Sequence, residues 1–290
     1  MENSIKLALE HNAEDIAVTA LKLQLDSVFA IDKIVVLVEG FTDKEFYAKI
    51  FNENVYLYKS EYGCGHFQCI LDKLKKYEKR FIVLKDADFD IVNSVDYSKY
   101  TNLFITDYHD AEIMCAFLSN KTENILTTKL LNSYERGLFD NIAESISIIS
   151  FIKWFNSRVD KKIGTKGLVS CYNANVELTL EQCLEKQNQK YGKSFDKNEV
   201  EKFISDNNSI DKKLITNGHD FCNALGKFIT EKRIQLKKSG KRNYDKIGIN
   251  EKCIQAELKD LFSIDYFTKT KMYKSILKWQ ISNNCLILSI

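Results

Sequence analysis

Three aspartates stand at two-residue spacing directly behind an apolar run. Asp86, Asp88 and Asp90 follow residues 81–85, of which all but the last are apolar. If the backbone stays extended, the three carboxylates share one face, because strand side chains repeat every second residue. Like charges this close repel, so a cation or hydrogen-bond donors must offset the repulsion. Such a carboxylate cluster suits Mg²⁺, or Mn²⁺ in its place, and phosphoryl transfer.

A further carboxylate follows a second apolar run. Glu39 comes directly after residues 34–38 and precedes Gly40, which permits a turn into a helix. Both runs are typical of buried parallel strands, whose carboxyl ends form the ligand-binding edge of an open α/β sheet. If the two strands are neighbours, Glu39 converges with Asp86 and Asp88. The result would be one acid beside a metal-binding pair of carboxylates.

Alternating strand and helix patterns surround these acids. They predict a strand at 34–40, a helix at 42–52, a strand at 55–61, a helix at 66–79, strands at 80–86 and 102–106, and a helix at 109–119. This alternation predicts an α/β fold with a parallel sheet flanked by helices. Residues 1–33 predict one amphipathic helix. Ile16, Ala20, Leu23 and Ser27 lie roughly along one face, and the face is widened by Val18, Leu21, Leu25 and Val28.

The pattern changes after residue 120. Apolar residues at helical spacing predict a helical insertion over 121–212, and residues 214–216 are a short strand candidate with which the sheet resumes. Two helices are expected near 251–262 and 267–281. The expected organisation is an N-terminal helix at 1–33, a core at 34–120, the insertion at 121–212, and a segment at 213–290 that completes the core and adds basic helices.

Four ordered motifs resemble a known family. Glu39 with Asp43, followed by Asp86-Ala87-Asp88, resembles the Toprim domain of topoisomerases, primases and OLD-type nucleases. The longer blocks at 38–47, 86–90, 106–112 and 217–220 are similar to an OLD-related Toprim family that includes the AriB-type effectors of the PARIS phage-defence system. The resemblance covers about 120 residues in two blocks.

This resemblance implies a Toprim-like fold and a Mg²⁺-dependent nuclease, which is a hydrolase. It implies that Asp86 and Asp88 bind metal and that Glu39 binds metal or acts as general acid or base. Glu112 matches the acid that OLD-type Toprim nucleases add at this helix start, as a further metal ligand. Asp90 is either another metal ligand or a residue that only faces solvent. It also implies a role in antiviral defence, an ABC- or AAA-type ATPase partner, and RNA such as tRNA as the target. The sequence itself leaves RNA and DNA open as substrates, and a homodimer is one further expectation. The alternative is a Toprim-like module that binds nucleic acid and senses or scaffolds without cutting.

Asp43, Asp110 and His219 are secondary candidates. Asp43 or Thr42 can cap the helix after Gly40, and Asp107 or Asp110 can cap the helix at 109–119. His219 belongs to a Gly-His-Asp turn in which Asp220 is the expected cap. The His-Asp pairs at 109–110 and 219–220 also occur in HD phosphohydrolases, but that fold is all-helical, whereas these pairs follow strand candidates.

A basic run lies in the C-terminal part of the chain. Residues 226–280 contain 14 Lys or Arg against 6 Asp or Glu, a local charge of +8. A charged run is usually a solvated face, but a nuclease needs contacts to a polyanion. The candidate phosphate contacts are Lys237, Lys238, Lys241 and Arg242.

Composition bounds the remaining choices. The chain has 290 residues, enough for one large or two small domains, and 44% hydrophobic and 28% charged residues, as in ordinary globular proteins. No run approaches the length of a membrane span, and no secretory signal is visible, so we expect a cytoplasmic protein without membrane contact. The 8 cysteines show no regular pairing, which favours reduced thiols.

Overall fold

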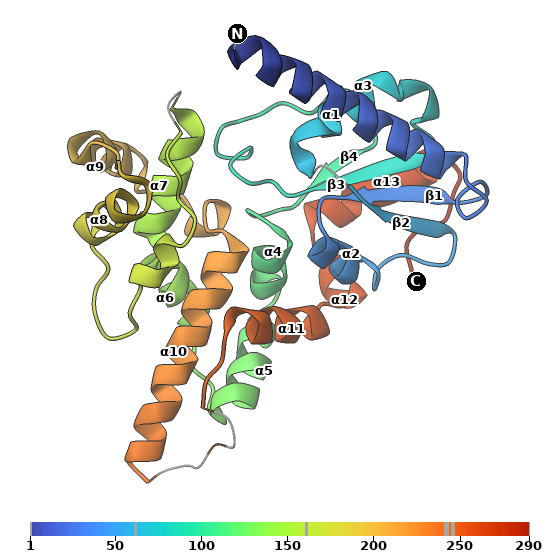
Figure 1. Cartoon of the computed structure of the whole chain (residues 1–290). Helices are drawn as coiled ribbons and strands as arrows, with labels where there is room; N and C mark the ends of the chain where they lie inside the picture. Colours follow the sequence, from blue (N-terminus) through green and yellow to red (C-terminus); the bar gives the residue numbers. More distant parts are fainter. Residues whose placement is uncertain (1, 61–62, 160–161, 241–243, 245–246, 290) are drawn as a thin grey trace. The chain divides into compact units, whose positions relative to one another are not determined.

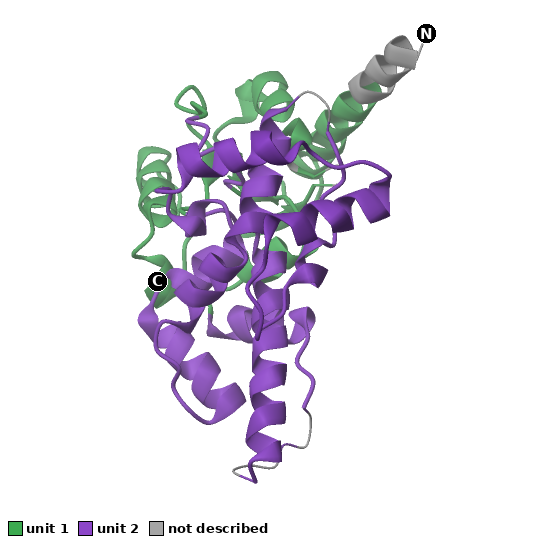
Figure 2. Cartoon of the chain, turned by 90° about the vertical axis from the view of Figure 1, so that its left-hand side faces the viewer, with its two compact units in different colours: residues 1–86, 95–107, 262–290 green, residues 87–94, 108–261 purple. Residues whose placement is uncertain are grey.

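The computed structural model describes residues 2–60, 63–159, 162–240, 244 and 247–289. The chain forms two compact units, and each is described by itself. The first comprises residues 1–86, 95–107 and 262–290, and the second comprises residues 87–94 and 108–261 (Figure 2). Within the described ranges, no helix is both long and apolar enough to cross a bilayer.

A parallel sheet of four described strands is the centre of the first unit (Figure 1). Its order is β2-β1-β3-β4, with β1 at Ile34–Val38, β2 at Val55–Lys59, β3 at Phe81–Lys85 and β4 at Leu103–Ile105. Residues 35–38 and 81–84 are at most 2% exposed, because both faces of the two central strands are covered. This burial explains their unbroken apolar sequence and confirms the predicted parallel α/β sheet.

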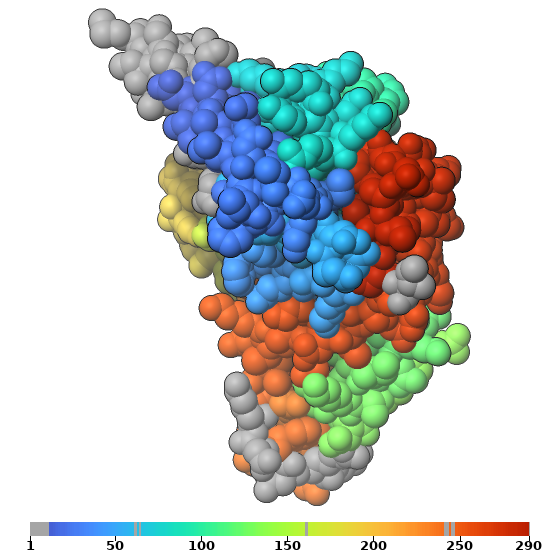
Figure 3. All heavy atoms as spheres, turned by 90° about the vertical axis from the view of Figure 1, so that its right-hand side faces the viewer, coloured from blue at the N-terminus to red at the C-terminus, as the bar shows by residue number. Residues whose placement is uncertain are grey.

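Helix α1 (Glu2–Leu25) packs beside α3 (Phe67–Lys73), as Figure 3 shows in blue and cyan. Its buried stripe is Ala17, Leu21 and Leu25, whereas Ile16 and Leu23 are 50% and 65% exposed. The predicted apolar face is therefore confirmed for Leu21 and Leu25 and wrong for Ile16 and Leu23. The helix carries two apolar stripes at helical spacing, and the stripe that contains the small Ala17 faces the sheet.

The C-terminal segment completes the first unit. Helices α2 (Phe41–Tyr47), α12 (Ile264–Phe267) and α13 (Lys271–Ser282) belong to this unit, and the last of these confirms the helix expected near 267–281. Edge-to-face ring contacts join Phe46 and Tyr47 of α2 to Phe262, at centroid distances of 5.5 and 6.3 Å. Phe262 also contacts Phe267, so residues distant in sequence share one aromatic core.

The second unit is helical over its described residues. Its α-helices are α4 (Ala111–Phe117), α5 (Asn120–Leu131), α6 (Leu138–Ser145), α7 (Ser147–Arg158), α8 (Leu180–Tyr191), α9 (Lys197–Asn207), α10 (Gly218–Lys238) and α11 (Glu251–Leu261). The helical character predicted for 121–212 and for 251–262 is confirmed.

The strand predicted at 214–216 is wrong. Lys212–Leu214 instead forms the 3₁₀ turn η4, where the Asp211 side chain accepts a hydrogen bond from the Lys213 N–H at 3.1 Å. Ile215 is fully buried beside Phe151 and Trp154. Ile215 is apolar because it packs among helices. The sheet therefore does not resume at 214–216.

Arg80 connects the end of α1 to the start of β3. Its guanidinium donates hydrogen bonds to the carbonyl groups of Leu25, Ala30 and Ile31, at 2.8, 3.2 and 2.9 Å. We expect Arg80→Met to lower the free energy of unfolding by about 2 kcal/mol, because charge-assisted hydrogen bonds are lost. Denaturant unfolding measures this change. The exposed neighbour Lys79 is the control, and equal effects of Arg80→Met and Lys79→Met would contradict the prediction.

Candidate active site

Glu39 and Asp86 lie at one edge of the sheet. They directly follow β1 and β3, which pair in parallel with Val35 opposite Phe81 and Leu37 opposite Val83. The hypothesis that the two strands are neighbours is confirmed. Both acids are partly exposed, and both belong to the first unit.

The turn after Glu39 is fixed by Asp43. The Asp43 carboxylate accepts a hydrogen bond from the Gly40 N–H at 2.8 Å, which is one half of a capping box, because Gly40 has no side chain to form the other half. Asp43 is only 8% exposed. The structure therefore gives Asp43 the capping role, while Thr42 is not the cap.

Asp88 and Asp90 do not continue the extended strand. Asp88 has a φ of +47°, in the left-handed region, and its N–H donates to the His109 carbonyl at 2.7 Å. The Asp90 N–H donates to the Ala87 carbonyl at 2.7 Å, which closes a turn. The expectation that the three aspartates share one extended face is therefore wrong, because the strand ends at Lys85 and buried Ala87 begins the turn.

The candidate acids divide between the units. Glu39 and Asp86 belong to the first unit, and Asp88, Asp90 and Glu112 belong to the second. Asp86 is the last residue of its segment, so the Asp-Ala-Asp motif is also the point at which the chain passes from one unit to the other.

Asp110 joins two helix N-termini in the second unit. It is the N-cap of α4, where Oδ1 accepts a hydrogen bond from the Ile113 N–H at 2.9 Å. Its Oδ2 accepts from the Gly218 N–H of α10 at 2.5 Å and lies 3.1 Å from His109 Nδ1. Burial opposes ionisation, but these hydrogen bonds and His109 outweigh it and hold the pKa of Asp110 below its ordinary value. This geometry assigns Asp110 a capping role.

Asp107 caps a different helix, in the first unit. Its two carboxylate oxygens accept hydrogen bonds from the Lys271 and Met272 N–H groups at 2.7 and 2.9 Å, at the start of α13. Of the two caps considered for the helix at 109–119, Asp110 is therefore the one that the structure uses.

A polar network in the second unit contains Glu112 and His219. Glu112 is 4% exposed in the first turn of α4, and its Oε1 accepts a hydrogen bond from Gln255 Nε2 at 3.2 Å. His219 Nδ1 lies 2.6 Å from Glu251 Oε1 and 3.2 Å from Gln255 Nε2. Burial alone would lower the pKa of His219, but the Glu251 hydrogen bond and the charges of Glu112, Glu251 and Asp110 raise it. The network places the His219 imidazole beside carboxylates, in reach of solvent.

Two members of this network were missed by the sequence reasoning. Glu251 and Gln255 lie on α11, which was predicted only as a helix. The acid at 251 is one of many on polar helix faces, so no sequence signal singled it out. Asp220 was expected to cap α10, but Asn217 is the N-cap, and Asp220 forms an ion pair with Lys153 at 2.5 Å.

The basic run is only partly available for phosphate. Arg233 is buried, with Nε donating to the Leu130 carbonyl at 2.8 Å, and Lys232 pairs with Glu135 at 3.4 Å. Lys237 and Lys238 are exposed in the last turn of α10. Lys241 and Arg242 lie outside the described residues.

Two carboxylates at the sheet edge are the candidate ligands for a divalent cation. Among the described residues, no group of three or more His, Cys, Asp or Glu side chains could by itself hold a metal ion. Mg²⁺ commonly uses one or two carboxylates, and water and substrate phosphate oxygens fill its other positions. The carboxylates of Glu39 and Asp86 match that chemistry.

Comparisons with known proteins add no family to these observations. No model of a known protein family matches the chain, and no curated protein is similar enough to count as a relative.

The close approach of α4 and α10 depends on Gly218. A Cβ at this position would lie 2.5 Å from Asp110 Oδ1 and 2.6 Å from the Glu112 Cβ. We expect Gly218→Ala to lower the free energy of unfolding by about 1–3 kcal/mol through overpacking, measured by denaturant unfolding. Gly65, where a Cβ would meet nothing within 4 Å, is the control. A loss no greater than that of Gly65→Ala would show that the contact relaxes freely.

Glu251 should control the ionisation of His219. We expect Glu251→Gln to lower the pKa of His219 in an NMR titration, because the hydrogen bond weakens and a negative charge is lost, while burial remains. A raised histidine pKa stabilises the fold below the unfolded value of about 6.5, and this contribution is lost as the pH rises through the folded pKa. The stability difference between wild type and variant should therefore shrink at high pH. Glu257→Gln on the same helix is the control, since Glu257 pairs with Lys129.

Proposed function

We propose that this protein is a Mg²⁺- or Mn²⁺-dependent endonuclease of the Toprim type. The observation that carries the proposal is the placement of Glu39 and Asp86 behind two neighbouring parallel strands, at the carboxyl edge of the sheet. Ligands of open α/β sheets bind at that edge. The order of the acids along the chain, with Asp88 two residues after Asp86, supports the same assignment.

Each acid has a distinct task in this proposal. Asp86 supplies carboxylate oxygens for the cation, and Glu39 either adds a ligand or moves a proton to or from the reacting water. Asp88 is proposed as a ligand from the resemblance of its motif. The bound cation would neutralise the charge that develops on the scissile phosphate. Asp43 acts indirectly, because its hydrogen bond to Gly40 fixes the backbone beside Glu39. Asp90 and Glu112 are proposed as further ligands from the resemblance of their motifs.

The substrate proposed is a nucleic acid, either RNA such as tRNA or DNA. Lys237 and Lys238 are exposed at the end of α10 and supply positive charge that phosphate groups can contact. The resemblance of the motifs further favours a defence effector that an ATPase partner controls. These partner assignments rest on the motifs alone.

The test compares isosteric variants that remove one negative charge each. Wild type, Glu39→Gln and Asp86→Asn are incubated with tRNA and with plasmid DNA, in Mg²⁺, Mn²⁺ or EDTA. We expect wild type to cut one of these substrates only with metal, and each variant to lose about 10²-fold or more in rate. Thermal unfolding with and without Mn²⁺ provides a second readout, because a metal that binds the native state raises the melting temperature of wild type.

Glu53→Gln is the matched control, because Glu53 is an exposed carboxylate of the same unit. It should keep full activity and the full metal-dependent rise in melting temperature. Binding of nucleic acid by wild type without metal-dependent cutting would favour the non-catalytic sensor or scaffold. Unchanged cutting by Asp86→Asn would remove the proposed site.

A further inference from the structure

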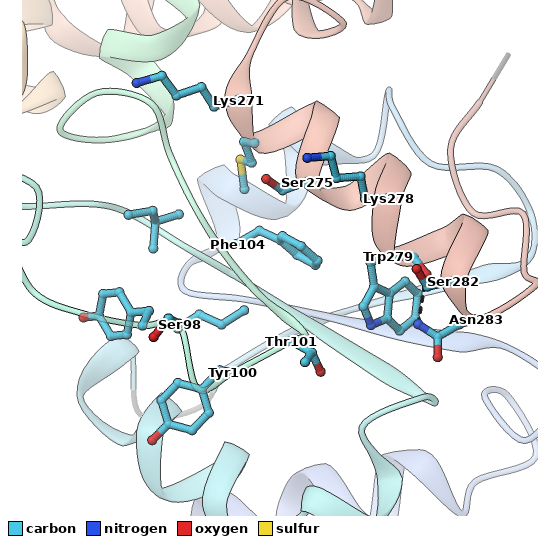
Figure 4. A pocket seen from close by; sticks show the side chains of 14 residues that line it. Ser98, Tyr100, Thr101, Phe104, Lys271, Ser275, Lys278, Trp279, Ser282 and Asn283 are labelled. Carbon is cyan, nitrogen blue, oxygen red and sulfur yellow. Dashed lines mark hydrogen bonds between the residues drawn. The ribbon is translucent and has the colours of Figure 1, made fainter.

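A groove lies beside β4 in the first unit, and neither Glu39 nor Asp86 lines it (Figure 4). Its volume is about 660 Å³. One wall is β4 with the turn before it, and the other wall is α13. Phe104 projects from β4 toward the helix, and Trp279 lies opposite, so the floor between the walls is apolar.

The β4 wall presents unused backbone groups. β4 is an edge strand that pairs only with β3. The Asn102 carbonyl and the Thr106 N–H bond to β3, at 2.8 and 3.1 Å. Because backbone groups alternate in direction along a parallel strand, those of Leu103 and Ile105 face away from β3, toward the open edge. An open edge of this kind is a template for one more strand.

The α13 wall carries positive charge on the face that borders the groove. Lys271, Ser275, Lys278 and Ser282 recur at helical spacing and all line the groove. None of the described residues that line it is acidic. Both lysines are exposed, and neither forms an ion pair among the described residues. Charge complementarity therefore calls for an anionic occupant.

The start of α13 disfavours a phosphate ligand. A helix N-terminus binds phosphate through free N–H groups. Here Asp107 already accepts hydrogen bonds from the Lys271 and Met272 N–H groups, and Thr270 accepts one from Tyr273. The positive charge of the groove therefore comes from the lysine side chains, which match carboxylates along a chain that runs beside β4.

We propose that this groove binds an extended, acidic segment of a partner protein, which adds to the sheet as a strand beside β4. Backbone hydrogen bonds to Leu103 and Ile105 hold the segment in register. Its side chains alternate, so apolar ones reach Phe104 and Trp279, while carboxylates reach Lys271 and Lys278. This site is independent of the proposed nuclease function.

The probe for the test is a fluorescein-labelled peptide of ten residues with alternating glutamate and valine, capped at both ends. Fluorescence anisotropy with the full chain should show saturable binding. A peptide with lysine in place of glutamate should not bind. The glutamate peptide N-methylated at every second residue should not bind either, because it cannot pair along a sheet edge. Amide hydrogen exchange at Leu103 and Ile105 should slow when the unmodified peptide is present.

Variants on α13 separate this site from general charge attraction. Lys271→Glu and Lys278→Glu should each weaken binding about fivefold or more, the upper range for an exposed ion pair. Lys274→Glu is the control, because it makes the same charge change on the same helix at a residue that does not line the groove. The peptide affinity of this variant should stay within about twofold of wild type.

Four outcomes would overturn the proposal. The first is absence of binding at millimolar peptide, and the second is equal binding of the N-methylated peptide. The third is an equal loss of affinity in the Lys274→Glu variant. The fourth is displacement of the peptide by a ten-nucleotide thymidine oligomer that itself slows amide exchange at Leu103 and Ile105. The last outcome would assign the groove to single-stranded nucleic acid.

Discussion

The buried carboxylate of Asp110 is the interaction on which the second unit depends. It accepts hydrogen bonds from the first turns of two helices, α4 and α10, and contacts the His109 ring. A buried charge is tolerated only when donors surround it, and helix N-termini supply such donors together with a favourable dipole. Because Gly218 has no side chain, α10 comes close enough to donate directly. The same residues bring Glu112 and His219 into one hydrogen-bonded network, and the His109 backbone holds Asp88 in its turn.

The first unit follows a different constraint, which is the direction of its strands. All pairings in the sheet are parallel, so residues that follow β1 and β3 must emerge at the same edge. The apolar strands thereby place Glu39 and Asp86 at the same edge of the sheet. Capping then fixes the local backbone, as Asp43 does behind Glu39 and Asp107 does at the start of α13. Acidic residues in this unit therefore serve both as candidate ligands and as helix caps, and local geometry separates the two roles.

Much of the fold was predictable, because burial on both faces leaves a clear sequence pattern in β1 and β3. The neighbouring positions of Glu39 and Asp86 follow from that pattern. The conformation of Asp88 was not predictable, because one left-handed residue ends the two-residue repeat. The contact face of α1 was predicted only in part, since two apolar stripes compete and only packing selects one. Glu251 and Gln255 lie on a helix far along the chain from His219, so their contact with it left no local sequence pattern. The strand prediction at Ile215 was wrong because a buried apolar residue fits a helical core equally well.

The first unit is built from three separate stretches of chain, which affects how it can form during synthesis. Its aromatic core joins α2 to Phe262 and Phe267, and the Tyr47 hydroxyl contacts Met272 Sδ across 225 residues of sequence. Contacts of such long range form late, because closing so long a loop of chain costs conformational entropy. The described helices of the second unit lie within the intervening chain, so that unit can be fully synthesised while the sheet still lacks its last helices. During that interval the aromatic rings of α2 lack their partners. They stay uncovered until residues 262–282 have been synthesised and have folded against them.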